Sequence, residues 1–335
     1  MKEIVHIVLN NGPTNMGFND FYKNTQESDL LIFEQVNSVE KSSFENGINF
    51  LKHLYKIRDT YKIYHIHSHI LCFITCLFFL FVRPTNLKKC LYTVHTSRNN
   101  LNFKNFIFYS VSVLLAQRVV YCGKSSENSF NDYISKATRH KQRCITNGVK
   151  VYPSNFSSKI YDKYIYVGRL IELKKIDFLV DNFYKYNHSR ILHIIGDGSR
   201  RDELQENYSS EFIVFHGLKP RQFVFDQLVS SCVFISASSK EGLPVAALEA
   251  SSFGLFLLLS DIPPHREISK KIPHCLLFKD EKEFKKHLQY LENKNKDFFQ
   301  KVFSDNVKAT FDCFSVEAML VSYFKIYHEM GLRQK

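Results

Sequence analysis

The chain has 335 residues, of which 44% are hydrophobic, and it carries a formal net charge of +12. This length and apolar content predict two globular domains with buried cores, and they exclude a disordered or fibrous chain. Residues 1–150 hold most of the excess charge, with 19 Lys and Arg against 10 Asp and Glu. That imbalance suits contact with lipid headgroups or nucleic acid, although a solubilising surface gives the same pattern.

Cysteine usage and apolar runs predict a protein that stays in the cytoplasm. The eight cysteines are scattered without a C-x-x-C pair, which indicates reduced core thiols, no disulfides and no zinc. Residues 1–10 lack the basic region and long apolar segment of a signal peptide. The longest apolar run, 70–82, is shorter than the ~20 residues of a transmembrane helix, so it predicts a core or interfacial helix.

The first predicted strand, residues 3–9, is followed by a loop that contains glycine. Ligands of open parallel sheets bind beyond the carboxyl ends of strands, so Asn11, Gly12 and Gly17 are candidates for the wall of a cleft. A simple turn explains the same residues equally well.

Strand and helix patterns then alternate through the first half of the chain. Further strands are expected near 30–35, 63–67, 91–95, 118–122 and 143–146, and helices near 44–60, 70–82, 103–116 and 125–135. This alternation predicts a doubly wound parallel sheet. His67 and His95 fall at the ends of two of these strands, where a side chain faces a ligand cleft, although a lone histidine is more often structural.

The polar segment 151–159 separates the first half from a second alternating pattern. Its strands are expected at 163–167, 191–195, 212–215, 232–236 and 255–259, and its helices near 175–187, 200–207, 220–229 and 244–253, with helical periodicity from 281 to the end. We therefore predict Rossmann-like domains over 1–155 and 160–310, and a C-terminal helix over 311–335 that packs back towards the first domain.

A Gly-Leu-Pro corner at 242–244 opens one of these helices. Pro244 suits a first helical position, so the backbone N–H groups of residues 243–247 are expected to point out of the helix towards an anion, most often a phosphate. Glu241 and Glu249 would repel a phosphate, and they are better placed to accept hydrogen bonds from a sugar and a ribose. The ligand that fits is a nucleotide sugar, and an ordinary helix with a charged first turn is an equally simple explanation.

Two open α/β domains on a short linker predict the GT-B architecture, with both domains facing a central cleft. The second half resembles the retaining glycosyltransferases of family 4 over about residues 164–268. The motifs that carry the resemblance are Gly168-Arg169-Leu170 with Lys174, Gly196-Asp197-Gly198, His216-Gly217, the E-x7-E pair Glu241 and Glu249, and the segment from Ser260 to Glu267. Thr93-Val94-His95 and Asn147-Gly148-Val149 match the family more weakly.

The resemblance implies roles for these residues. Arg169 and Lys174 hold the diphosphate, Glu249 binds the ribose, Glu241 binds the donor sugar, and His95 lies near the transferred sugar. The expected catalytic set is His95, Glu241, Arg169 and Lys174. Donor binding also involves Gly12, Gly168, Gly198, Gly217, Gly242, Leu243, Pro244 and Glu249, whereas Asn11, Gly17 and Asn147 lie on the acceptor side. No metal and no other cofactor are implied.

Three positions depart from the family pattern. Lys175 stands where a glycine usually follows the lysine, Phe256 replaces the proline common after Gly254, and the first loop lacks a double glycine. The last difference lies on the acceptor side.

The sequence thus predicts a retaining transferase that moves a hexose or N-acetylhexosamine from a nucleotide donor to a lipid-linked oligosaccharide. UDP is favoured over GDP as the carrier, the setting is bacterial lipopolysaccharide, O-antigen or capsule assembly, and the basic first domain is expected on the cytoplasmic face of the inner membrane. The alternatives are a nucleotide-sugar 2-epimerase of the same architecture and a basic nucleic-acid-binding protein, for which no recognition motif is present.

Overall fold

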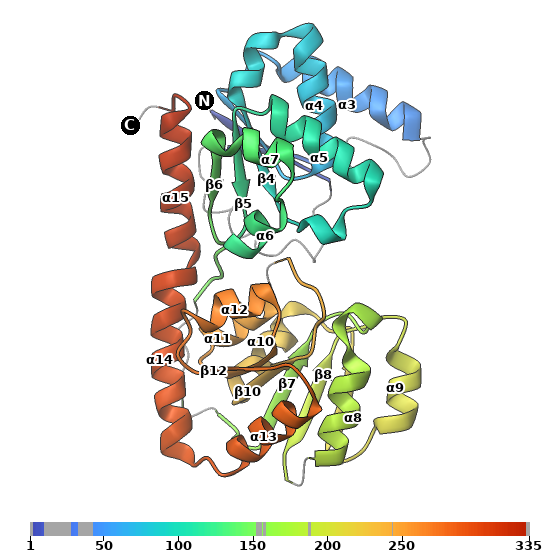
Figure 1. The fold of residues 1–335 in the computed structure, drawn as a ribbon, viewed down its shortest axis with the longest axis vertical. Coiled ribbons are helices and arrows are strands. Elements are labelled where there is room, and N and C mark those ends of the chain that lie inside the picture. The colour runs from blue at the N-terminus through green and yellow to red at the C-terminus, as the bar shows by residue number, and fades with distance from the viewer. Residues whose placement is uncertain are drawn as a thin grey trace. The chain divides into compact units, whose positions relative to one another are not determined.

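The computed structural model describes residues 3–9, 28–32, 43–151, 156, 159–186, 189–242 and 244–332. The chain folds as two compact units. Unit 1 comprises Met1–Gly148 together with Val316–Lys335, and unit 2 comprises Val149–Ser315. Each unit is built on a parallel six-stranded sheet (Figure 1), which confirms the predicted α/β class.

The sheet of unit 1 has the strand order β2-β1-β3-β4-β5-β6. Its strands are β1 (Ile4–Val8), β2 (Ser28–Ile32), β3 (Ile63–Ile66), β4 (Cys90–Val94), β5 (Arg118–Tyr121) and β6 (Gln142–Cys144). Its helices are α3 (Ser43–Ile57), α4 (His69–Val82), α5 (Phe103–Leu115), α6 (Lys124–Ser129), α7 (Tyr133–Ala137) and α15 (Val316–Glu329), with short 3-10 turns at Pro84–Lys89, Arg98–Asn100 and Arg139–Lys141. The order reverses between β1 and β3, where open α/β sheets bind ligands.

Two apolar layers cover the two faces of this sheet. On one face α3, α4 and α5 pack against buried strand residues such as Ile7, Tyr64 and Tyr92. On the other face α15 places the helical stripe of Val316, Met319, Tyr323 and Tyr327 against Ile4, Ile63, Leu91 and Val120. The last helix of the described chain therefore completes the core of the unit that contains the first strand.

The sheet of unit 2 has the order β12-β11-β10-β7-β8-β9. Its strands are β7 (Lys163–Val167), β8 (Ile191–Ile195), β9 (Ile213–Gly217), β10 (Val233–Ser236), β11 (Phe256–Ser260) and β12 (Cys275–Phe278). Its helices are α8 (Ile176–Tyr186), α9 (Arg201–Tyr208), α10 (Arg221–Ser230), α11 (Val245–Ser252), α12 (Pro263–Ser269), α13 (Glu281–Glu292) and α14 (Lys296–Phe314), with a 3-10 turn at Glu172–Lys174.

Two helical expectations need correction. The helix expected over 125–135 is two short helices, because Asp132 caps the start of α7 by accepting a hydrogen bond from the Ser135 N–H. The helical pattern from 281 onward is divided into α13, α14 and α15. Asn295 caps α14 through the Phe298 N–H, and Ser315 adopts an extended conformation before α15.

The apolar run at 70–82 forms α4, which ends at Val82 just before Pro84, as the sequence predicts. Its 14 residues pack partly into the core of unit 1. Within the ranges that the structure describes, no helix combines the length and apolarity needed to cross a bilayer.

Candidate functional site

Three motif loops of unit 2 are joined by backbone hydrogen bonds at the carboxyl ends of neighbouring strands. The Gly168 N–H, after β7, donates to the Ile195 carbonyl at 3.0 Å, and the Gly196 N–H, after β8, donates to the Gly217 carbonyl at 3.0 Å. Gly168 and Gly217, which the sequence assigned to donor binding, therefore lie in one connected group of loops at one edge of the sheet.

Close backbone packing explains two of the motif glycines. Gly196 has a φ of 146°, and a Cβ there would lie 1.8 Å from the Gly168 carbonyl oxygen. Gly198 has a φ of 159°, and a Cβ there would lie 2.4 Å from the Leu170 carbonyl oxygen. Any side chain at either position would push the loops apart, so both glycines are required to form the site, whatever ligand the site holds.

A pocket of about 200 Å³ opens beside these loops and the start of α11. Five residues predicted from the sequence line it together: Gly168, Arg169, Lys174, Glu241 and Pro244. Four other donor-side predictions, Gly198, Gly217, Gly242 and Glu249, are not among its lining residues. Asn11, Gly12, Gly17 and Leu243 lie outside the described residues.

The helix start at this pocket differs in detail from the expectation. Pro244 precedes α11 with a ψ of 78°, so Val245, not the proline, is the first helical residue. The Ala247 N–H donates to the Pro244 carbonyl at 3.1 Å. The Ala247 N–H is therefore not available to a ligand, contrary to the expectation. Val245 and Ala246 line the pocket, and their N–H groups come before the first hydrogen bond within the helix.

Lys174 and Glu241 form an ion pair on the pocket wall. The Lys174 Nζ donates to the Glu241 Oε1 at 2.5 Å, and the two side chains are only 17% and 12% exposed. Lys174, which was predicted to bind the diphosphate, and Glu241, which was predicted to bind the sugar, therefore neutralise each other in the free protein. The sequence placed both residues in one site without predicting this contact, since they are 67 positions apart.

The backbone conformation of Lys175 explains why glycine is usual at this position in the family pattern. Lys175 ends the turn Glu172–Lys174 in the left-handed conformation, with φ 47° and ψ 43°. It is the one non-glycine residue with positive φ in the described part of the chain. Glycine adopts this conformation without strain, which is the physical reason to find glycine at this position.

Glu249 lies in α11 and accepts a hydrogen bond from the Arg221 guanidinium at 2.9 Å. Arg221 comes from α10, and its guanidinium carbon lies 4.5 Å from the centre of the Phe225 ring. The Glu249 side chain is 13% exposed. Arg221 was missed because no motif marks it: only the fold brings it to Glu249, 28 residues later in the chain.

In unit 1, His95 follows β4 and contacts two neighbours through its two ring nitrogens. Its Nε2 lies 3.1 Å from the His67 Nδ1, and its Nδ1 lies 3.2 Å from the Cys122 Sγ. Asn147 hydrogen bonds the Cys122 side chain, so the acceptor-side prediction Asn147 and the catalytic prediction His95 belong to one group. Burial raises the pKa of the Cys122 thiol, which stays protonated near neutral pH.

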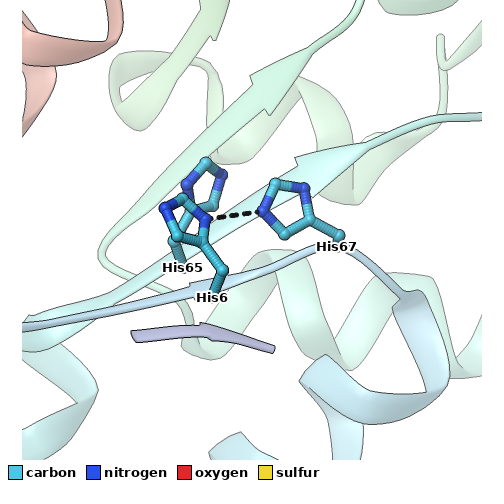
Figure 2. Close-up of side chains that lie close together, drawn as sticks. All are labelled: His6, His65 and His67. Carbon is cyan, nitrogen blue, oxygen red and sulfur yellow. Dashed lines mark hydrogen bonds between the residues drawn. The ribbon is translucent and has the colours of Figure 1, made fainter. Parts of the chain in front are cut away.

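Two further histidines extend this group into the sheet. The His6 Nδ1 lies 3.1 Å from the His67 Nε2, and His65 lies beside both (Figure 2). Burial lowers the pKa of His6 to about 3, and it holds the pKa values of His65 and His67 well below the ordinary value. All three imidazoles are therefore neutral at pH 7. His6 and His65 lie inside predicted strands and carry no motif, so sequence patterns did not single them out.

Comparisons with known proteins point to one class of enzyme. Residues 162–294 match the family model described as glycosyl transferases group 1. The O-antigen biosynthesis glycosyltransferase WbnH of Escherichia coli is 29% identical over 180 residues, which cover 52% of each chain. The lipopolysaccharide 1,6-galactosyltransferase of Salmonella typhimurium is 33% identical over 107 residues, covering 29% of this chain and 30% of that protein. The chain spans about half the length, or less, of these two relatives.

Solved structures match nearly the whole chain. HepE of Anabaena, solved with UDP and glucose, has a TM-score of 0.76 at 11% identity and covers 98% of this chain and 100% of its own. The lipopolysaccharide outer core galactosyltransferase WaaB has a TM-score of 0.71 at 16% identity and covers 98% and 99%. These likenesses confirm the predicted GT-B fold. The matched segment lies within unit 2, which holds the Lys174–Glu241 pocket.

Proposed function

We propose that this chain is a glycosyltransferase that takes a sugar from a nucleoside diphosphate and passes it to an acceptor in the assembly of a bacterial surface polysaccharide. The observation that carries the proposal is the pocket of unit 2, where Arg169, Lys174 and Glu241 meet at the start of α11. The matched family model and the relatives named for O-antigen and lipopolysaccharide synthesis support it.

The pocket chemistry suits departure of a diphosphate. Breaking the bond between sugar and phosphate leaves negative charge on the phosphate oxygens, and fixed positive groups lower the barrier to that charge. Arg169 is exposed, and the structure records no ion pair for its guanidinium in the described ranges. Arg169, Lys174 and the N–H groups of Val245 and Ala246 then act as the charge-stabilising groups, and no divalent ion is needed in this step.

Glu241 takes the sugar end of the donor. Its carboxylate lines the same pocket as the two cations and accepts hydrogen bonds. When the diphosphate draws Lys174 away, Glu241 is released to accept hydrogen bonds from sugar hydroxyls. Transfer with retention at the anomeric carbon is part of the proposal, as is a hexose or N-acetylhexosamine as the transferred group. UDP is the proposed carrier, in keeping with the UDP present in the HepE structures.

The proposed acceptor is a lipid-linked oligosaccharide at the cytoplasmic face of the membrane. Helices α4 and α5 pack with Phe73 near Phe108, and each leads from the carboxyl end of one parallel strand to the start of the next, so the two helices run in the same direction. The end of α4 therefore lies at the opposite end of this helix pair from the start of α5. At the end of α4, Leu80 is 38%, Phe81 82% and Val82 41% exposed, and such apolar side chains insert among lipid headgroups.

A two-stage experiment tests this function. Thermal shift against UDP, GDP, ADP, CMP and TDP is expected to single out UDP, because a ligand that binds only the native state raises its stability. Incubation with the UDP-sugar that binds best and with lipid-linked acceptor fractions should then give a glycosylated product with retained anomeric configuration by NMR. Arg169→Ala serves as the control and is expected to lower transfer by ~10². Epimerised free sugar without acceptor, or wild-type turnover in Arg169→Ala, would overturn the proposal.

A further inference from the structure

Three histidines from two neighbouring strands of unit 1 face one point. His6 of β1 is in register with His65 of β3, and His67 follows two residues later, so all three project from the same face of the sheet. One ring nitrogen from each lies within 4.8 Å of the others. Figure 2 shows the three rings gathered at this place.

The spacing of the rings is close to that around a tetrahedral metal ion. At a metal–nitrogen distance of 2.0–2.1 Å, two ligand nitrogens lie about 3.3 Å apart and their ring centres about 5 Å apart. The His6 Nδ1 and the His67 Nε2 are 3.1 Å apart. The centre of the His6 ring lies 4.9 Å from the centre of the His65 ring and 5.4 Å from that of the His67 ring. The centres of the His65 and His67 rings are 4.1 Å apart. To bind a metal ion, the His65 and His67 rings must therefore move apart by about 1 Å.

Partners on the far side of two rings hold them in the orientation that coordination needs. The His67 Nδ1 lies 3.1 Å from the His95 Nε2, and the His65 Nδ1 lies 2.7 Å from the Tyr327 hydroxyl. Metal-bound imidazoles usually donate their second N–H in this way. The His65 Nε2 contacts the Thr93 hydroxyl at 2.7 Å, and coordination exchanges this contact for the metal while Thr93 keeps its contact with Tyr323.

The donor set selects the class of metal. It consists of neutral imidazole nitrogens without a carboxylate, which suits Zn²⁺, Cu²⁺ or Ni²⁺ and not Mg²⁺ or Ca²⁺. We propose that the His6 Nδ1, the His65 Nε2 and the His67 Nε2 bind one Zn²⁺-type ion, with water in the fourth position. The ion ties β1 to β3, and through Tyr327 it ties both strands to α15. This site lies in unit 1, and the inference goes beyond the proposed transfer without depending on it.

The test is Zn²⁺ binding to the untagged full chain after treatment with EDTA. Calorimetry is expected to show one Zn²⁺ per chain, and Co²⁺ is expected to give the visible absorption of a tetrahedral site. His67→Gln is the main variant, because His67 is half-buried and tolerates replacement better than His6 or His65. It should lose this binding, and Tyr327→Phe should weaken it by about 10- to 100-fold.

A second histidine pair in unit 2 provides the matched control. The His193 Nδ1 lies 2.9 Å from the His216 Nε2, with no third histidine recorded beside them in the described chain. His216→Gln should keep the Zn²⁺ stoichiometry and the Co²⁺ spectrum. Equal Zn²⁺ affinity in wild type and a folded His67→Gln variant, or loss of binding in His216→Gln, would overturn the proposal. UDP binding measured on the same samples reports separately on the donor pocket.

Discussion

Replacing Glu241 by glutamine should make UDP bind more tightly while transfer becomes slower. In the free protein Lys174 donates to Glu241 across 2.5 Å, and both side chains are largely buried. A diphosphate that takes up Lys174 must replace this contact and approach a carboxylate of like charge. Glutamine keeps the shape of the side chain and a weaker hydrogen bond but removes the competing charge.

The size of the effect follows from the ion pair. A hydrogen bond between charged groups contributes about 1.5–3 kcal/mol and a neutral one about 1 kcal/mol. In Glu241→Gln the diphosphate therefore has to replace a contact that is weaker by about 0.5–2 kcal/mol, which corresponds to roughly 2- to 30-fold tighter UDP binding. Transfer from the full donor should fall by about 2- to 30-fold, because the sugar hydroxyls exchange a charged acceptor for a neutral one.

A double-mutant cycle tests the reasoning by calorimetry with UDP at fixed ionic strength. The gain in affinity should vanish when Glu241→Gln is combined with Lys174→Met, because the two residues act on each other. Glu249→Gln is the matched control: its carboxylate bonds Arg221 and does not line the pocket, so it should not tighten UDP binding. Unchanged or weaker UDP binding in Glu241→Gln, or the same gain without Lys174, would refute the assigned competition.

Three further predictions concern strain, pH and lipid. Lys175→Gly should raise the free energy of unfolding by about 1 kcal/mol in denaturant titrations, because it relieves the left-handed backbone; a loss of stability would contradict the strain argument. Burial lowers the pKa of Lys159 to about 7, so between pH 7 and 10.5 the unfolded chain binds more protons there than the folded chain. The free energy of unfolding should therefore rise by about 2 kcal/mol between pH 7 and pH 9, and Lys159→Met, compared at both pH values, should remove this rise. Phe81→Asp should reduce cosedimentation with anionic vesicles, whereas Tyr133→Asp, at an 86% exposed position on α7, should not; equal losses would count against membrane contact by the end of α4.

The fold was predictable because the sequence patterns of strands and helices are local and recur along the chain. Apolar strand segments alternate with amphipathic helices in both halves, so a one-residue error at a boundary leaves the α/β class unchanged. The break between α6 and α7 was harder to predict, because a cap at Asp132 divides one periodic segment into two. Likewise, residue 244 looked like a first helical position on composition alone, but its backbone angles place it before the helix.

The candidate site was predictable where residues carry motifs, and not where the fold alone brings them together. Gly168, Arg169, Lys174 and Glu241 lie in ordered motifs and line one pocket. Arg221 and His6 carry no motif, and they reach Glu249 and His67 through strand and helix packing across tens of residues. Sequence patterns likewise could not reveal that Lys174 and Glu241 are partners in the free protein.

The place of α15 has a consequence for synthesis on the ribosome. All of unit 2 is translated before residue 316, so the nascent chain can finish its second sheet while the first sheet still lacks a cover over Ile4, Ile63 and Leu91. His65 and Thr93 also wait for the hydroxyls of Tyr327 and Tyr323. Domains usually fold in the order in which they emerge from the ribosome. Here unit 1 emerges first, but it is the last unit to complete its core. Chains that end at residue 315 and are held on the ribosome by a C-terminal linker long enough to span the exit tunnel should therefore hold a protease-resistant unit 2 beside a protease-sensitive unit 1.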